Sequence, residues 1–325
     1  MPFAYGAAGL TLVADRGLHG LPRLSSFAHA DLVVHVDASP HWASSASPIL
    51  FYTSPYRDPR GTPVVHVNRT TEGFAFVYAD GTRFWIDTPG QHIWMTSERT
   101  AEDACTYLAG PVLSFAFRLR GDFSLHASAV ATAAGAVAIA GGHGVGKSTT
   151  AAALGLAGRP VLTDDILRVT GAGGDWQAHP FGGILRLWPD GEALVFGRGD
   201  RLGLITPFWD KRALPIGDDG VPAADRCLPL AGVAFLTPEA TADDAVVLST
   251  LSPAAAAVRL ADNSSVAYLL DGPGRAREFH QVVSIAARVP CIDIARPADA
   301  RSLDEVRSTL SEWMDTLGSP APVRA

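Results

Sequence analysis

The first 120 residues contain short apolar runs separated by turn residues, which is the pattern of β-strands. The runs TPVVHVNRT, GFAFVYADGTRFWID and QHIWMTS are rich in Val, Phe, Tyr, Trp and Thr, and Gly, Asp and Pro punctuate them. Asp80-Gly81 predicts a hairpin, because both residues tolerate a positive φ angle. We therefore expect an antiparallel meander, with the aromatic residues of 74–94 in its core rather than in a ligand site.

Two segments have the apolar spacing of helices. Over 101–121, Ala, Leu and Phe recur at helical intervals. Ser302-Leu303-Asp304-Glu305 is a capping box, which predicts the start of a last helix, and Gly318 predicts its end. One face of this last helix is apolar and consists of Val306, Leu310, Trp313, Met314 and Leu317.

The middle of the chain predicts strand, turn, strand, glycine-rich loop and helix in succession. HASAVAT and AVAIAG are the two strands, and GKSTTAAALGLAG is the helix, ended by Gly158. The segments 159–170 and 230–238 predict further strands. We expect a β-rich N-terminal domain over 1–120, an α/β domain over 121–318 and a disordered tail over 319–325.

Composition narrows the class of protein. The chain has 325 residues, 47% of them hydrophobic, and a net charge of −7, which is ordinary for a globular protein and unlike the basic surface of a nucleic-acid binder. A membrane span needs about 20 strongly apolar residues, and the N-terminus lacks the basic start of a signal peptide. The three cysteines are far apart and suggest neither disulfides nor zinc. We expect a cytoplasmic protein with no nucleic-acid or membrane partner.

The glycine-rich loop matches the Walker A pattern, Gly141-x-x-x-x-Gly146-Lys147-Ser148. Glycines let the backbone N–H groups surround phosphate oxygens, and the following helix presents its positive N-terminal end to the same anion. Lys147 is expected to reach the β and γ phosphates, and Ser148 to bind Mg²⁺, so ATP and Mg²⁺ are the expected cofactors. The nucleotide-binding residues predicted here are Gly141, Gly142, His143, Gly144, Val145, Gly146, Lys147, Ser148 and Thr149.

Acidic residues follow the loop at a distance that suits a kinase. Asp164-Asp165 comes after a helix and a short apolar run, so the strand could lie beside the loop strand and bring both carboxylates near the γ-phosphate. Phosphoryl transfer uses acids to hold the metal and to accept the proton of the acceptor hydroxyl. His126 could return to the level of the loop through a hairpin. Adjacent aspartates are also common at solvated strand ends, and a lone histidine is more often structural.

The chain lacks the sequence signatures of other classes of phosphate-loop protein. Neither lysine of the chain stands in an Asn-Lys-x-Asp motif of the GTPases, and no LSGGQ-like segment of transporter ATPases is present. A kinase remains. Arg186 is a weaker candidate, as a phosphate clamp, although Trp188 and Pro189 beside it suit a packed corner. Arg275 and Arg277 are more typical of a solvated turn.

LHASAV, GGHGVGKST and LTDDI, in this order and spacing, resemble the catalytic domain of bacterial HPr kinase/phosphorylase. The resemblance implies a mixed-sheet α/β kinase fold similar to that of phosphoenolpyruvate carboxykinase. It also implies catalytic roles: Asp164 as the general base with His126 near it, Asp165 as a magnesium ligand with Ser148, and Lys147 at the transferring phosphate. The family forms hexamers, so a homo-oligomer is implied as well.

The segments HPFGGILRLWPD and FHQVVSIAARVPCIDIARP resemble the smaller HPr-kinase-related proteins of ribosomal-peptide biosynthesis clusters, which include lasso-peptide kinases. This implies a kinase that phosphorylates a serine of a peptide or protein, such as the C-terminal serine of a lasso precursor. His126-Ala127 replaces the His-Gly of true HPr kinases, and the family's glycine-rich signature, which is linked to phosphorylase action and HPr docking, is not recognisable near 182–190. The N-terminal β domain also differs from the regulatory domain of that family, so neither HPr as substrate nor dephosphorylation is implied. A small-metabolite kinase similar to shikimate kinase and a nucleotide-sensing module without turnover stay open.

Overall fold

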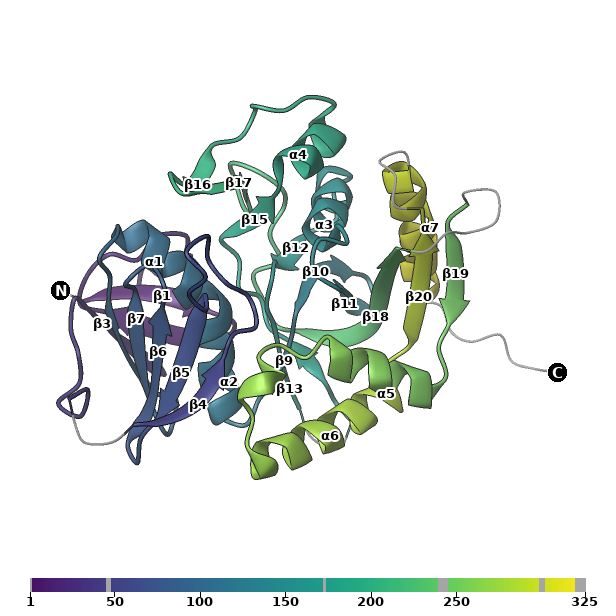
Figure 1. Cartoon of the computed structure of the whole chain (residues 1–325). Helices are drawn as coiled ribbons and strands as arrows, with labels where there is room; N and C mark the ends of the chain where they lie inside the picture. Colours follow the sequence, from purple (N-terminus) through teal and green to yellow (C-terminus); the bar gives the residue numbers. More distant parts are fainter. Residues whose placement is uncertain (1, 45–47, 172–173, 239–244, 298–301, 319–325) are drawn as a thin grey trace. The chain divides into compact units, whose positions relative to one another are not determined.

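The computed structural model describes residues 2–44, 48–171, 174–238, 245–297 and 302–318, and the expected tail 319–325 lies outside this range. The chain divides into two compact units (Figure 1). The first consists of Met1–Asp122 and Ser265–Arg277, and the second of Phe123–Ser264 and Glu278–Ala325. Each unit has its own sheet and its own core.

The first unit is built on an eight-stranded sheet with the order β1-β2-β3-β8-β7-β6-β5-β4. From β4 to β8 the strands form an antiparallel meander, with the Asp80-Gly81 hairpin between β6 and β7, whereas β3 pairs in parallel with both β2 and β8. The strands are β1 (Phe3–Ala7), β2 (Leu10–Ala14), β3 (Leu32–Val36), β4 (Ile49–Thr53), β5 (Val65–Arg69), β6 (Gly73–Tyr78), β7 (Arg83–Asp87) and β8 (His92–Thr96).

Helical segments α1 (Ala101–Tyr107), η1 (Leu108–Val112) and α2 (Leu113–Leu119) follow the sheet. Phe115 of α2 packs edge-on against Phe74 of β6, with ring centroids 4.9 Å apart. The single helix predicted over 101–121 is therefore interrupted. Gly110 has non-helical angles (φ −122°, ψ −119°), because the residue before a proline is pushed out of the helical region and Pro111 follows it.

The segment 265–277 comes late in the chain and still belongs to the first unit. Its short helix η3 (Ala267–Leu269) places Tyr268 on Tyr52 of β4, with ring centroids 4.3 Å apart. Ser114 donates a hydrogen bond to Ser265 over 2.8 Å. No sequence pattern predicted that this segment belongs to the first unit, because its place there depends on side-chain contacts between residues far apart in the sequence.

The second unit is a mixed α/β structure, as expected, with a nine-stranded sheet in which β12-β10-β11-β18-β14-β13-β9 are neighbours and β20 joins β18 to β19. The pairs β11–β18 and β18–β20 are parallel and the others antiparallel. The strands are β9 (Phe123–Leu125), β10 (Ala127–Thr132), β11 (Gly135–Gly141), β12 (Val161–Thr163), β13 (Leu167–Thr170), β14 (Gln177–Ala178), β18 (Leu228–Pro238), β19 (Val247–Thr250) and β20 (Cys291–Arg296).

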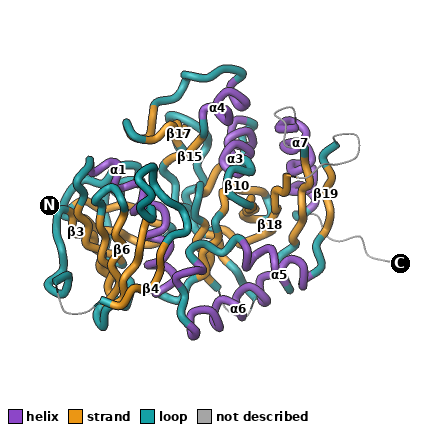
Figure 2. Tube along the Cα trace, in the orientation of Figure 1, coloured by secondary structure: helices purple, strands orange, loops and turns teal. Residues whose placement is uncertain are grey.

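Helices cover both faces of this sheet (Figure 2). Alternate residues of β11 face opposite sides: Ala138 lies in one core with Leu260 and Ile285 of the helices α5 and α6, and Ile139 in the other with Leu154 of α3 and Leu310 of α7. A small sheet lies beside α3. These remaining elements are α3 (Lys147–Leu156), α4 (Pro189–Phe196), α5 (Pro253–Asp262), α6 (Gly272–Ala286), α7 (Ser302–Thr316), β15 (Ile184–Leu187), β16 (Leu204–Thr206) and β17 (Trp209–Pro215).

Two expectations about 159–170 are wrong. The segment forms two strands, β12 and β13, separated by a bend at Asp164-Asp165, where Asp165 has a φ of +71°. In addition, β12 pairs with β10 and not with the loop strand β11. The outer position is favourable because β10 and β11 form a tight hairpin, which leaves the far edge of β10 open to β12.

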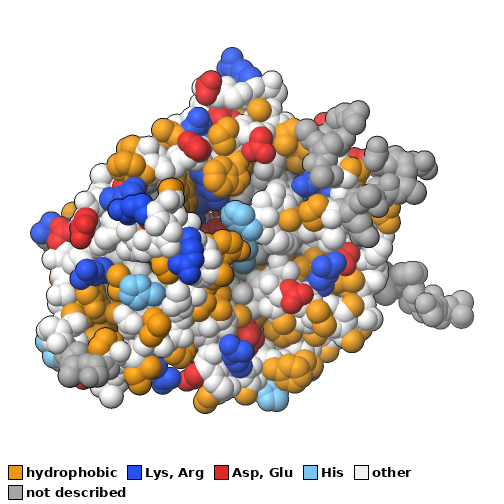
Figure 3. All heavy atoms as spheres, in the orientation of Figure 1, with side chains coloured by type: hydrophobic (Ala, Val, Ile, Leu, Met, Phe, Trp, Pro, Cys, Tyr) orange, Lys and Arg blue, Asp and Glu red, His pale blue; other side chains and the backbone are white. Residues whose placement is uncertain are grey.

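Not all hydrophobic side chains of the second unit are in its core. Val258 of α5 and Phe279 and Val283 of α6 are exposed, and Figure 3 shows hydrophobic side chains on the surface over these helices. Within the described ranges, none of the helices combines the length and the apolar character that a membrane crossing requires.

Candidate active site

The glycine-rich loop leaves β11 and enters α3 through residues that only glycine can supply without strain. Gly141 has a φ of +144°, and a Cβ there would lie 2.6 Å from the carbonyl oxygen of Leu236. Gly146 has a φ of +94° and is the N-cap of α3. A side chain would clash at Gly141 and would be strained at Gly146, so glycine at both sites lets the backbone fold into the tight loop that a phosphate needs.

Lys147 lies in the first turn of α3 and is buried. Its Nζ donates hydrogen bonds of 2.9 Å to the carbonyl oxygens of Gly141 and Gly142. Burial lowers the pKa of Lys147, and the carboxylates of Asp165 and Asp164 oppose that shift. The ammonium group is therefore held in the loop, at the positive end of a ten-residue helix, where an anion is favoured.

Asp164 is buried and both of its carboxylate oxygens accept hydrogen bonds. The hydroxyl of Ser128, on β10, donates to Oδ1 over 2.7 Å, and the backbone N–H of Arg186, on β15, donates to Oδ2 over 2.8 Å. Asp164 thus ties the bend to two strands. It does not line the pocket described below.

Asp165 has the opposite orientation and meets two basic groups. Its Oδ2 lies 2.9 Å from Nη1 of Arg186, and its Oδ1 lies 3.3 Å from Nδ1 of His126. Burial alone would raise the pKa of Asp165, but the charges of Arg186 and His126, with smaller contributions from Lys211 and Lys147, hold it below its ordinary value. Asp165 is therefore a carboxylate that stays ionised.

The hydrogen bond of His126 fixes its tautomer. Nδ1 lies 2.9 Å from the backbone carbonyl oxygen of Asp165, and a carbonyl can only accept. Nδ1 therefore carries a hydrogen, and in the neutral ring Nε2 is an acceptor. The hairpin β10–β11 brings His126 to this place, since Ala127 pairs with Ala140 at the end of the loop strand.

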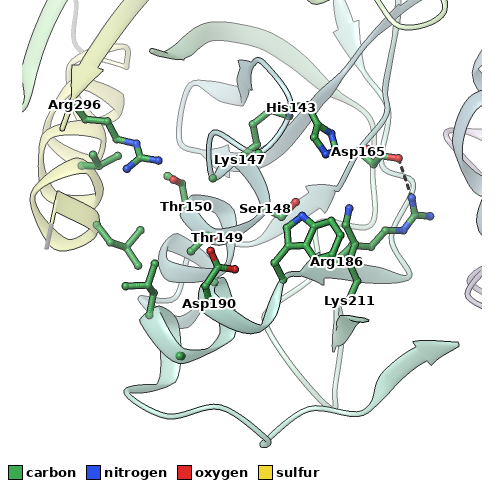
Figure 4. Close-up of a pocket in the computed structure, with 18 of the residues that line it drawn as sticks. His143, Lys147, Ser148, Thr149, Thr150, Asp165, Arg186, Asp190, Lys211 and Arg296 are labelled. Carbon is green, nitrogen blue, oxygen red and sulfur yellow. Dashed lines mark hydrogen bonds and ion pairs between the residues drawn. The ribbon is translucent and has the colours of Figure 1, made fainter. Parts of the chain in front are cut away.

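These groups surround one cavity of about 510 Å³. Figure 4 shows Lys147, Asp165 and Arg186 around it, with the ion pair of Asp165 and Arg186 marked. Among the predicted residues, the lining includes His126, His143, Gly144, Gly146, Lys147, Ser148, Thr149, Asp165 and Arg186. Gly141, Gly142 and Val145 are not among the lining residues, and their carbonyl groups accept hydrogen bonds from Lys147 and Arg296. Asp164 supports the bend between β12 and β13.

Several residues of the lining were not predicted from the sequence. Arg296, at the end of β20, donates to the carbonyl of Val145 and so braces the loop. Lys211 of β17 faces the loop from the small sheet, and Asp190 lies on α4. The apolar part of the lining includes Leu194 of α4 and Leu303 and Val306 of α7. For Lys211 a signal existed, because it is one of only two lysines in the chain.

Other weak candidates lie elsewhere. Arg275 and Arg277 belong to the first unit, and Arg275 donates to the carbonyl of Leu270. These contacts are those of structural residues.

Comparisons with known proteins give little. No family model matches the chain, and no curated protein matches it. Among solved structures, the chain is similar to the Hpr(Ser) kinase/phosphatase from Coxiella burnetii, with 13% identity and a TM-score of 0.32, over 60% of this chain and 99% of that one. A similarity at this level does not assign a function to the chain.

Proposed function

We propose that the protein is an ATP- and Mg²⁺-dependent phosphotransferase that moves the γ-phosphoryl group of ATP to a serine hydroxyl of a peptide or protein. The observation that carries the proposal is a single cavity lined both by the phosphate loop and by the pair of His126 and Asp165. A loop alone would support phosphate binding. A loop that faces an ionised acid and an imidazole acceptor supports transfer.

The shape of the cavity suggests how ATP lies in it. The β and γ phosphates would lie at the N-terminus of α3, near Lys147 and Ser148. The apolar surface of Leu194, Leu303 and Val306 suits the nucleoside, since ligand pockets use apolar walls for most of the buried area. This orientation leaves the Asp165 side of the cavity for the acceptor.

The residues present fit a magnesium ion. Mg²⁺ in kinase sites takes one or two carboxylates together with phosphate oxygens and waters, so a cluster of several acids is not required. The carboxylate of Asp165 and the hydroxyl of Ser148 both line the cavity and are oxygen donors of the right kind. When bound, the ion would neutralise charge on the β and γ phosphates.

The proposed step is an in-line displacement at the γ-phosphorus. A bond forms between the acceptor oxygen and phosphorus, the bond from phosphorus to the β,γ-bridging oxygen breaks, and ADP leaves. The hydroxyl proton passes to Nε2 of His126, whose Nδ1–H is held by Asp165. Lys147 stabilises the negative charge on the phosphoryl oxygens.

This assignment moves the proton from Asp164, where the resemblance put it, to His126. Both oxygens of Asp164 already accept hydrogen bonds from Ser128 and Arg186, which supports a positioning role for this acid. The narrower acceptor that the resemblance implies, the C-terminal serine of a lasso-peptide precursor, belongs to the same proposal.

The test is a transfer assay with γ-labelled ATP and Mg²⁺ against serine peptides, including lasso precursors, and against small polyols and acids. Lys147→Ala should lose MgATP binding and transfer. His126→Asn should keep MgATP affinity and slow transfer by about 10²–10⁴-fold, the usual contribution of a general base. Transfer only to small molecules would refute the peptide acceptor. Binding of ATP with no transfer and no hydrolysis would favour a nucleotide sensor.

A further inference from the structure

The second lysine of the chain also lies in the cavity. The sequence has 26 lysines and arginines, and only Lys147 and Lys211 are lysines. Four of the 26 line the cavity, and these four include both lysines, together with Arg186 and Arg296. The chain uses arginine at every other basic position, so both of its compact ammonium groups lie in this cavity.

Lys211 differs from the other basic residues of the cavity in its contacts. Arg186 pairs with Asp165, Arg296 donates to the carbonyl of Val145, and Lys147 donates to loop carbonyls. Over the described ranges, Lys211 has neither a hydrogen bond nor an ion pair. Its Nζ lies 5.2 Å from the ring centre of Trp188 and 5.8 Å from that of Trp209. Two aromatic rings thus hold the ammonium group and leave its three N–H donors to a ligand.

The charge of Lys211 acts across the cavity on the loop. Burial lowers the pKa of His143, and the charge of Lys211 lowers it further; Lys211 also opposes protonation of Lys147. Both ammonium groups also help to lower the pKa of Asp165, so an anion in this part of the cavity is favourable to both. Figure 4 shows Lys211 beside Arg186, at the Asp165 side of the cavity and away from Arg296.

We propose that Lys211 is a catalytic residue that contacts the γ-phosphoryl group of ATP from the side opposite Lys147. The proposal rests on the proposed phosphotransferase function. During transfer, negative charge is spread over the three equatorial oxygens of the phosphoryl group, so donors on two sides stabilise it better than donors on one. An ammonium group can follow the moving oxygens, whereas a planar guanidinium would stack on Trp188.

The experiment compares MgATP with MgADP, which lacks the γ-phosphate. Binding of each is measured by calorimetry for wild type, Lys211→Met, Lys211→Arg and the control Arg226→Met, which removes a positive charge from an exposed site outside the cavity. Lys211→Met should lower the preference for MgATP over MgADP by roughly tenfold or more, the scale of one lost charged hydrogen bond. Its MgADP affinity should stay within about twofold, and Arg226→Met should match wild type.

Lys211→Arg keeps the charge, so its preference for MgATP should stay near that of wild type, while γ-phosphate transfer or hydrolysis should slow by about tenfold or more. An unchanged preference and rate in Lys211→Met would overturn the role of Lys211 and leave the proposed function standing. An equal loss of MgATP and MgADP affinity would also overturn it, because the residue would then support the fold or the nucleoside. If wild type binds neither nucleotide, the proposed function and this inference both fail.

Discussion

Replacement of Asp164 separates a positioning role from a catalytic one. The side chain is 6% exposed, and its partner Ser128 is fully buried. Asp164→Ala leaves the Ser128 hydroxyl and the Arg186 N–H without their acceptor. An unsatisfied buried group costs about 1–3 kcal/mol, so the loss at the fully buried Ser128 should lower the free energy of unfolding by about that amount, and the partly buried N–H of Arg186 adds a smaller amount. Against a typical total of about 5–15 kcal/mol, this loss is large.

Asp164→Asn has nearly the same shape and should behave differently. The amide oxygen can accept from the N–H of Arg186, and the amide nitrogen can donate to the hydroxyl oxygen of Ser128. The cost should therefore be that of one ordinary hydrogen bond, about 0.5–1.5 kcal/mol. Since the proposed proton acceptor is His126, Asp164→Asn should keep most of the transfer rate.

Equilibrium urea unfolding measures the first effect, and transfer from γ-labelled ATP measures the second. Ser128→Ala is the matched control, because it removes one of the two partners and should cost less than Asp164→Ala. An Asp164→Asn protein with the stability and the MgATP affinity of wild type, but with transfer reduced about 10³-fold or more, would refute the positioning role. Asp164 itself would then accept the proton.

Three further predictions concern the loop, the thiols and the acid limit of stability. Gly146→Ala and Gly158→Ala both force alanine to a φ near +95° at an end of α3, at a cost of about 1–2 kcal/mol by thermal unfolding. Only Gly146→Ala should also weaken MgATP binding, because it distorts the phosphate loop. Cys227 is exposed and should react first with a thiol reagent, while the other two cysteines, whose burial raises their pKa, should react only on unfolding. Burial raises the pKa of Asp165, but Arg186 helps to hold this pKa below its ordinary value of 3.8. The ionised carboxylate of Asp165 therefore makes its full contribution to stability above pH 3.8, and this contribution is lost as the pH falls through the lower pKa of the folded protein. Asp165→Asn should therefore flatten the acid side of the stability profile measured by urea unfolding.

Local patterns predicted the elements that local physics determines. The β10–β11 hairpin, the helix after the loop and the apolar face of α7 follow from periodicity, turn residues and glycine positions, and all three are observed. The order of the strands could not be predicted, because the pairing of β12 with β10 depends on contacts between distant segments. Lys211 and Arg296 reach the cavity only through such contacts, since β17 and β20 are far from the loop in sequence.

The sequence allowed part of the difference between Asp164 and Asp165 to be predicted, namely that only one of them lines the cavity. Successive side chains of an extended chain point to opposite sides, so two adjacent aspartates cannot both face one cavity without a turn. The partners of the two acids are also close in sequence, since Ser128 lies on β10 and His126 immediately precedes that strand. His126 contacts Asp165 and Ser128 contacts Asp164, so β10 and the residue before it supply a polar partner for each acid.

The hydrogen bond to Asp164 explains why a polar residue, Ser128, lies in a buried part of β10. A hydroxyl among the alanines of β10 is costly unless it is hydrogen-bonded, and Asp164 is its acceptor. The bond fixes the bend between β12 and β13, and the bend sets the direction of Asp165 toward His126 and Arg186. The orientation of the proposed proton acceptor therefore depends on a buried contact outside the cavity. A change at Ser128 should alter the transfer rate more than it alters the affinity for MgATP, because neither Ser128 nor Asp164 is among the residues that line the cavity.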